Sequence, residues 1–290
     1  MFGWTIQQDQ GFAVLDAFYE CGGRMIDTAE GYSSWIPGNK GGESESIIGA
    51  WLESRGVRKD MRIASKTGQG APAGCYAPAL VEAAIAGSLE RLRTDYLDLY
   101  YVHRDDLTAG LEDVVPVFGE QVRKGLARAL GVSNMTAARL AEANAIADRI
   151  GATRFTVCQP QYNLVARGEY EGALQRLCLS QGIAALPYYG LASGFLTGKY
   201  ASAEDWAGSS RAHALGQFAA NGGWRTLDAI RVIAAETGAT PAAIALAWLN
   251  ARPGVAAPIA SATTPGQVRE ICAGATLQLS TAQMASLDSR

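Results

Sequence analysis

Four ionisable side chains lie at or just beyond the ends of short β-rich segments. They are Asp27, Tyr32, Lys66 and His103. A carboxylate, a phenol, an amine and an imidazole can each donate, accept or hold a proton, so together they suit general acid–base chemistry. Each alone has a plainer explanation: the aspartate can cap the next segment, the lysine can extend to solvent, and the histidine can be a satisfied core residue. If the fold brings all four side chains to the same end of its strands, a catalytic site is favoured.

The elements that must position these groups alternate along the chain. Short β-rich segments are followed by longer segments whose apolar residues recur at helical spacing. Thr240 before Pro241, and Ser280 with Gln283, predict two helix starts. The segments predicted as strands are residues 24–27, 61–65, 96–102, 126–132, 157–159, 183–187 and 255–259.

This rhythm predicts a parallel sheet covered by helices, either an open doubly wound sheet or a closed barrel. The length of 290 residues and a strand number near eight favour a single (β/α)8 TIM barrel domain over residues 1–290. In such a barrel, function gathers at the C-terminal ends of the strands, where the four ionisable groups lie. Residues 201–223 are rich in small side chains and are predicted as a mobile loop, with an ordinary surface excursion as the alternative.

Composition excludes several classes of function. The net charge is −3 with 18% charged residues, and no Lys/Arg cluster stands out, so nucleic acid and anionic membranes are poor partners. The apolar runs are too short to span a membrane, and residues 1–10 do not resemble a signal peptide, so a cytoplasmic location is the default expectation. The five cysteines form no CxxC pair, and two histidines exclude a histidine-rich metal site but not one built from carboxylates alone. We predict no metal.

A series of short motifs gives the chain a resemblance that covers almost its whole length in order. Residues 27–32 (DTAEGY), 42–49 (GESESIIG), 65–66 (SK) and 99–103 (LYYVH) resemble the aldo-keto reductase signature. The resemblance continues at residues 131–134 (GVSN), 159–163 (QPQYN), 187–188 (PY) and 196–200 (LTGKY). It implies the (β/α)8 fold, a nicotinamide cofactor and carbonyl reduction.

The resemblance also implies a role for each of the four groups. Hydride delivered to a carbonyl carbon leaves an alkoxide that needs a proton, and a phenol with a pKa near ~10 is a reluctant donor unless its environment helps. The Lys66 ammonium would stabilise the tyrosinate of Tyr32, and Asp27 would keep that ammonium charged. His103 would orient and polarise the substrate oxygen. Tyr32 is therefore the expected general acid.

Further residues are implied to contact the cofactor. Ser133, Asn134 and Gln159 would hydrogen-bond the carboxamide of the nicotinamide, and Tyr188 would stack on its ring. The alternatives are a helix cap for Ser133 or Asn134 and a core position for Tyr188. Leu191, Ser193 and Lys199 are implied to line the pyrophosphate. Ser261, Thr263 and Gln267 are implied to hold the adenosine end, at the start of a helix suited to phosphate.

Two features depart from the family pattern. Many relatives carry Arg or Lys where Thr263 and Gln267 stand, to pair with a 2′-phosphate, and Arg269 is the nearest base here. NADPH is the expected cofactor, with NADH as the alternative. The chain also lacks a β-hairpin before residues 2–4, so either the first barrel strand is truncated or the chain starts upstream.

The substrate pocket is expected to be walled by loops that carry Trp4, Trp35, Tyr76 and Arg104. The indole of Trp35 suits an apolar or aromatic carbonyl compound, which is the small-molecule partner we predict. The alternative for each of these side chains is a partly exposed loop residue. The sequence indicates neither the physiological substrate nor the oligomeric state.

Two other readings compete with a reductase. One is a cofactor-binding sensor or regulatory protein of the same fold with little turnover, like the β subunits of potassium channels. The other is a metal-dependent barrel hydrolase, or a lyase with a Lys66 Schiff base. The histidine count opposes the hydrolase, and Asp27 and Tyr32 around Lys66 suit a charged lysine better than the neutral amine of a lyase.

Overall fold

A computed structural model of the chain describes residues 1–70, 72–209 and 211–289. The described chain forms two compact units. The first comprises Met1–Gln159 with Ser261–Pro265, and the second comprises the remainder. The single-domain organisation of residues 1–290 stays a prediction.

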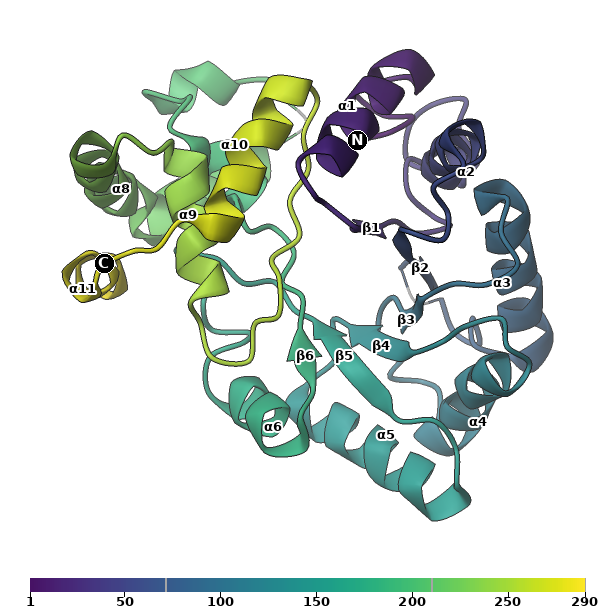
Figure 1. Ribbon diagram of the computed structural model, residues 1–290. Coiled ribbons are helices and arrows are strands. Elements are labelled where there is room, and N and C mark those ends of the chain that lie inside the picture. The colour runs from purple at the N-terminus through teal and green to yellow at the C-terminus, as the bar shows by residue number, and fades with distance from the viewer. Residues whose placement is uncertain (71, 210, 290) are drawn as a thin grey trace. The chain divides into compact units, whose positions relative to one another are not determined.

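The first unit is a parallel sheet whose strands follow one another in chain order. Figure 1 shows the strands following an arc, with helices on its outer side. Parallel neighbours cannot be joined by a tight turn, and a helix therefore crosses over between each pair. The strands are β1 (Met25–Asp27), β2 (Arg62–Thr67), β3 (Leu99–Val102), β4 (Leu130–Ser133) and β5 (Phe155–Gln159). The helices are α1 (Gln8–Glu20), α2 (Glu43–Arg55), α3 (Pro78–Leu92), α4 (Leu111–Arg123) and α5 (Ala137–Ile150).

Every residue of the central strand β3 is buried. This agrees with its continuous apolar run, which predicts a strand covered on both faces. Two glycines allow close packing in this unit. A Cβ on Gly131 would lie 2.5 Å from the ring of Tyr101. A Cβ on Gly49, in α2, would lie 2.1 Å from the carbonyl oxygen of Arg91, in α3. The sheet and the α2–α3 pair therefore depend on missing side chains at these positions.

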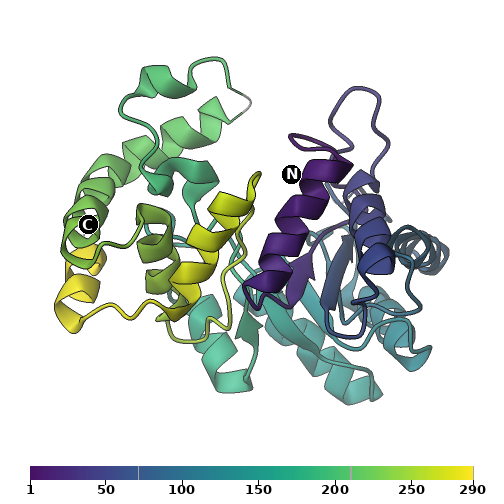
Figure 2. The same cartoon turned by 45° about the horizontal axis from the view of Figure 1, so that its top comes forward.

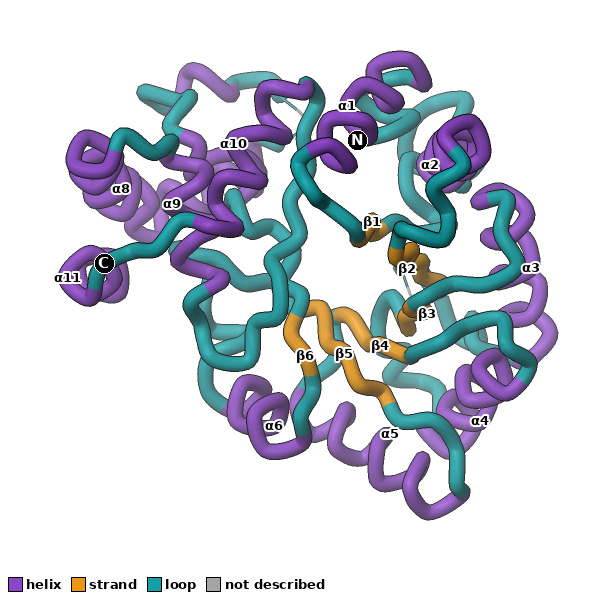
Figure 3. The backbone as a smooth tube through the Cα atoms, viewed as in Figure 1, coloured by secondary structure: helices purple, strands orange, loops and turns teal. Residues whose placement is uncertain are grey.

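The second unit is mainly helical, as the purple tube of Figure 3 shows. Its strand β6 (Ala184–Ala185) pairs with Val255 through an isolated bridge at Ala185. Its helical segments are α6 (Ala173–Gln181), η1 (Ala192–Thr197), η2 (Ala203–Trp206), α7 (Ala212–Phe218), η3 (Ala219–Gly223), α8 (Trp224–Thr237), α9 (Pro241–Asn250), α10 (Pro265–Thr276, whose first residue is assigned to the first unit) and α11 (Thr281–Asp288).

The two predicted helix starts in this unit are confirmed. The Thr240 hydroxyl accepts from the backbone N–H of Ala243, and Ser280 and Gln283 form a reciprocal capping box. Both caps satisfy backbone donors that the first turn of a helix leaves open.

The mobile loop predicted over residues 201–223 is wrong. The described part of this segment is largely helical, because it carries η2, α7 and η3, and Figure 2 shows these turns leading into α8. Trp206 stacks on Trp224 with centroids 5.7 Å apart, and Leu215 and Phe218 are buried. These few large side chains supply the apolar contacts that hold the segment. The many small residues between them conceal the pattern in the sequence.

The α/β class and the parallel sheet are confirmed, and six of the seven predicted strands occur as regular strands in the described ranges. The seventh, residues 255–259, is not a regular strand: Val255 makes one bridge, and the Ile259 N–H donates to the Pro187 carbonyl at 2.7 Å. Before α1, Phe2 and Ile6 form a single bridge rather than a hairpin. In the described chain no single helix has the length and apolarity to cross a membrane; residues 212–237 and 241–250 meet that test only as a pair bent by 100°.

Candidate active site

The strand ends bring the predicted groups to one edge of the first unit. Asp27 is the last residue of β1, Lys66 is next to last in β2, and His103 directly follows β3. Parallel strands present their carboxyl ends at the same edge, so the three side chains start close together. Tyr32 reaches this edge because the loop after β1 is hydrogen-bonded to β2. The Thr28 N–H donates to the Ala64 carbonyl at 2.9 Å, and the Glu30 N–H to that of Lys66 at 3.2 Å.

Lys66 is the centre of the site and is fully buried. Its ammonium donates to the Thr28 carbonyl at 2.8 Å, to the Tyr32 hydroxyl oxygen at 3.0 Å, and to one oxygen of Asp27. Burial by itself would lower the pKa of Lys66, but the Asp27 carboxylate and the Tyr32 phenol outweigh it, and the pKa lies above its ordinary value. The lysine is therefore charged at neutral pH. A charged donor on the Tyr32 oxygen stabilises negative charge there when a proton leaves.

His103 is half-buried beside Tyr32, with the two rings edge to face at a centroid distance of 5.8 Å. Burial, with help from the positive charges of Lys66 and Arg104, lowers its pKa from 6.5 to about 3, so the ring is neutral at neutral pH. Its Nδ1 is enclosed without a hydrogen-bond partner among the described residues. An enclosed lone pair is tolerated better than an enclosed N–H, which favours the tautomer that carries the proton on Nε2.

Three of the residues implied to hold the nicotinamide lie at the same edge. The Gln159 side-chain amide donates to the second oxygen of Asp27 at 2.9 Å. The Ser133 hydroxyl donates to the Gln159 carbonyl at 2.9 Å, and the Asn134 amide donates to the Ser133 hydroxyl and the His103 carbonyl, both at 3.0 Å. Neither Ser133 nor Asn134 caps α5, because Thr136 does. The structure therefore joins these residues to the ionisable group.

Two carboxylates that were not predicted from the sequence, Glu45 and Glu30, accept hydrogen bonds from residues at the carboxyl end of β2. Glu45 is fully buried and accepts from the Ser65 hydroxyl at 2.5 Å and from Arg91 Nε at 2.7 Å. Glu30 accepts from the Thr67 hydroxyl and from the Gly68 N–H at 3.2 Å. One signal was present in the sequence: Glu45 stands three residues before Ile48, on the buried face of α2.

The residues implied at the phosphates lie in the second unit, around a strained loop. Tyr189, Ala192 and Ser193 have positive φ although they are not glycines, and Gly194 follows with φ +93°. A Cβ on Gly194 would lie 3.3 Å from the ammonium nitrogen of Lys199. Successive left-handed residues form concavities of backbone N–H groups that suit anions. The Lys199 ammonium therefore lies beside Gly194, the residue that follows Ser193.

The remaining implied cofactor residues are more accessible. Tyr188 is half-buried rather than a core residue, and its ring packs edge to face on Tyr189 at 5.1 Å. Ser261 and Gln267 are exposed, and the half-buried Thr263 accepts from the Gln10 amide through its carbonyl at 2.7 Å. Contact of these residues with a cofactor stays a prediction.

The predicted substrate residues form two pairs. Trp4 packs edge to face on Trp35 at 5.7 Å, and Trp35 is 51% exposed. The buried Tyr76 donates its hydroxyl to the backbone carbonyl of the exposed Arg104 and packs on Phe118. Contact of either pair with a substrate stays a prediction.

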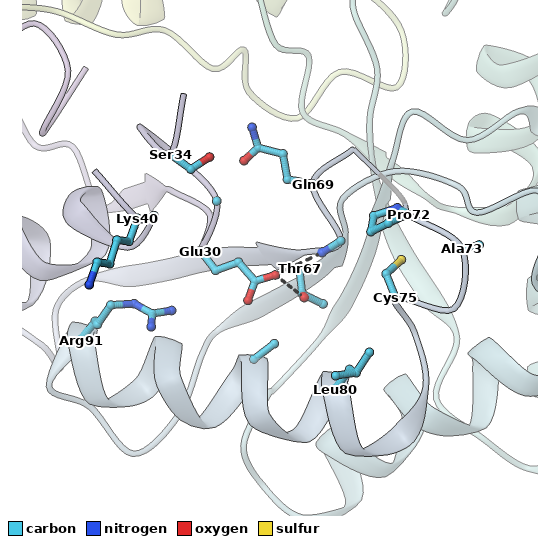
Figure 4. Close-up of a pocket in the computed structure, with 14 residues that line it drawn as sticks. Glu30, Ser34, Lys40, Thr67, Gln69, Pro72, Ala73, Cys75, Leu80 and Arg91 are labelled. Atoms are coloured by element: carbon cyan, nitrogen blue, oxygen red, sulfur yellow. Dashed lines mark hydrogen bonds between the residues drawn. The ribbon is translucent and has the colours of Figure 1, made fainter. Parts of the chain in front are cut away.

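A cavity of about 640 Å³ opens beside the Tyr32 loop. Figure 4 shows Glu30 and Thr67 joined at its middle, with Lys40 and Arg91 at one end and Cys75 and Leu80 toward the other. Its lining includes neither the four ionisable residues nor the predicted substrate residues. In the described ranges, no three His, Cys, Asp or Glu side chains are grouped as metal ligands.

Comparison with known proteins places this geometry in context. The sequence pattern of the aldo/keto reductase family matches residues 1–290. A probable voltage-gated potassium channel subunit beta from Oryza sativa is 32% identical over 93% of this chain and 83% of its own length. Norsolorinic acid reductase B from Aspergillus parasiticus is 32% identical over 65% of this chain and 50% of its own. An aryl-alcohol dehydrogenase [NADP(+)] from Phanerodontia chrysosporium is 31% identical over 66% of this chain and 51% of its own length.

Proposed function

The chain belongs to the aldo/keto reductase family, and from this premise we propose that it is an NADP(H)-dependent oxidoreductase that reduces an aldehyde or ketone to an alcohol. The observation that carries the proposal is the buried Lys66 ammonium, held by Asp27 and hydrogen-bonded to the Tyr32 oxygen. The same family membership leads us to infer that the strands belong to a (β/α)8 barrel.

The proposed roles follow from the charges. When bound, the reduced nicotinamide supplies hydride to the carbonyl carbon. Tyr32 donates its proton to the carbonyl oxygen, so an O–H bond forms on the product as the tyrosine O–H bond breaks. Lys66 stabilises the resulting tyrosinate, Asp27 holds Lys66, and a proton from solvent restores the phenol. Neutral His103 donates from Nε2 to the same carbonyl oxygen and orients it.

The chain's own residues fit the cofactor. Amide and hydroxyl groups of Ser133, Asn134 and Gln159 match a carboxamide, which needs both donors and acceptors. The positive-φ loop with Lys199 suits the pyrophosphate. NADPH is the proposed cofactor because one relative is named for NADP(+). NADH is the alternative because Thr263 and Gln267 carry no charge for a 2′-phosphate.

Aromatic carbonyl compounds are the substrates we propose to test first. The exposed indole of Trp35, paired with Trp4, offers a flat apolar surface three residues beyond Tyr32. One relative is named for an aryl alcohol, which is an aromatic compound.

Cofactor binding and turnover test the proposal together. Quenching of tryptophan fluorescence gives the Kd of NADPH and of NADH, and the fall in reduced-nicotinamide absorbance with 4-nitrobenzaldehyde gives turnover. We expect both, with NADPH bound more tightly. Binding without turnover across a broad panel of aldehydes would contradict a reductase and favour a sensor.

A further inference from the structure

The carboxylate of Asp27 is held at both oxygens. One oxygen accepts from the Lys66 ammonium and the other from the Gln159 amide at 2.9 Å. The Asp27 side chain is 9% exposed and Gln159 is 3% exposed. Among the described residues, Gln159 is the sole donor to that second oxygen. The two residues are 132 positions apart, at the ends of β1 and β5.

We propose that Gln159 is a positioning residue of the reaction, which fixes Asp27 and thereby holds Lys66 on the Tyr32 oxygen. This inference rests on the proposed function and adds a second role to the cofactor contact implied for Gln159. Through this role, the polar cluster at β4 and β5 acts on the proton-transfer group at β1 and β2.

The geometry explains why a second anchor matters. A carboxylate held at one oxygen rotates easily about its last side-chain bond, because that torsion is soft. Rotation would move the anchored oxygen away from Lys66, whose remaining acceptors are a carbonyl and a phenol. With the Gln159 amide on the second oxygen, the carboxylate plane is fixed from two directions.

The neutrality of Gln159 also matters. A cationic donor at this position would compete with Lys66 for the charge of Asp27, and a carboxylate would repel it. An amide donates a hydrogen bond without altering the net charge of the site. It therefore orients the carboxylate and leaves the ion pair to Lys66.

The backbone of Gln159 extends the connection toward His103. Its carbonyl accepts from the Ser133 hydroxyl, which accepts in turn from the Asn134 amide, and that amide also donates to the His103 carbonyl. One line of hydrogen bonds thus joins Asp27 on β1 to the residue after β3. Gln159 takes part in this line through two separate groups, its side-chain amide at Asp27 and its backbone carbonyl at Ser133.

Lysine NMR tests the inference without needing turnover. Proteins labelled with 13C at lysine Cε are titrated, with the Lys66 signal assigned by its loss in a Lys66→Met variant. We expect Gln159→Leu to lower the titration midpoint of Lys66. The matched control is Gln121→Leu, because Gln121 is also buried and donates to a backbone carbonyl, but lies in α4 away from the site. It should leave the Lys66 midpoint at its parent value.

Kinetics supply the second readout. Losing a hydrogen bond to a charged group should reduce kcat of Gln159→Leu by about tenfold or more, with the alkaline limb of the pH profile moved to lower pH. Gln159→Glu should be weakest at neutral pH and recover toward acid pH, where a protonated carboxyl again donates to Asp27. A weaker cofactor Kd in both variants, with unchanged Lys66 titration and unchanged pH profiles, would overturn the inference.

The outcomes separate this inference from the proposed function. If the parent protein turns over no carbonyl compound, the proposed function fails, while the Lys66 titration still decides whether Gln159 holds the ion pair. If Gln159→Leu does not fold, Gln159→Glu carries the test: its kcat should recover toward acid pH while the folded fraction measured by circular dichroism stays constant, whereas a merely structural loss would move both together.

Discussion

At the residue scale, the site is organised around one buried positive charge. Lys66 satisfies its three donors with a carboxylate, a carbonyl and a phenol, and the neutral His103 stands beside the phenol. A buried ammonium without such partners would lose its proton. The arrangement therefore keeps a cation next to the Tyr32 oxygen at neutral pH, which is what a phenolic acid needs.

Replacing Tyr32 by phenylalanine tests the general acid. We expect kcat for aldehyde reduction to fall by roughly 10²-fold or more, since general acid catalysis contributes about that much. The Kd of NADPH should stay near its parent value, because the substitution removes only the hydroxyl. Near-normal turnover in Tyr32→Phe would show that another group supplies the proton.

The lowered pKa of His103 predicts a pH dependence of stability. In the unfolded chain this histidine takes up a proton near its ordinary pKa of 6.5, whereas in the folded protein it does so only near 3. Stability from His103 is thus complete above pH 6.5 and is lost as the pH falls toward 3. Urea unfolding from pH 7 to 5 should show a steeper loss in the parent than in His103→Gln. An equal dependence of the unfolding free energy on pH in the two proteins would contradict burial of a neutral imidazole at position 103.

At the element scale, α2 and β2 are joined by a buried carboxylate. Glu45 receives hydrogen bonds from Ser65, the residue before Lys66, and from Arg91 on α3. This contact fixes where the helix after the Tyr32 loop meets the strand that carries Lys66. The α2–α3 packing at Gly49, with no room for a Cβ, constrains the same corner.

Removing this carboxylate should destabilise the first unit. We expect Glu45→Ala to lower the free energy of unfolding by about 2–4 kcal/mol, since Arg91 is 32% exposed and its stranded charge costs less than a fully buried one. Denaturant unfolding measures the loss. Glu53→Ala on the same helix is the control, because its 64% exposed side chain pairs with Arg93 at the surface and should matter by less than about 1 kcal/mol. Equal losses of unfolding free energy in the two variants would show that the buried Glu45 carboxylate contributes no more to stability than the exposed Glu53 does.

At the scale of the whole molecule, the proposed cofactor contacts are divided between the two compact units. Ser133, Asn134 and Gln159 belong to the first, and the loop before Lys199 belongs to the second. A cofactor that binds the folded chain and not the unfolded chain stabilises the folded chain by mass action.

Thermal or denaturant unfolding with and without cofactor tests whether the proposed residues of the second unit contact the cofactor. NADPH at a hundred times its Kd should add about 2.7 kcal/mol to the free energy of unfolding. A Lys199→Met variant should need more NADPH for the same stabilisation, whereas Lys124→Met, at the residue that follows α4, should behave as the parent. If Lys199→Met responds to NADPH as the parent does, the phosphate contact in the second unit is wrong.

The sequence by itself determined the α/β class, most strand positions and the four ionisable groups. Asp27, Lys66 and His103 were predictable because local periodicity locates strand ends, and parallel strands bring those ends to one edge. The family pattern supplied Tyr32. The loop prediction for residues 201–223 was wrong because the apolar contacts of this helical segment come from a few large residues scattered among small ones.

The tertiary structure alone decided which groups touch. The bond from Gln159 to Asp27 joins residues 132 positions apart, and the burial of Glu45 depends on Ser65 and Arg91 arriving from separate elements. Nothing local encodes such pairs, because a side chain's hydrogen-bond partner is set by strand register and helix packing. Periodicity reports which face of an element is buried, and only the folded chain determines what that face meets.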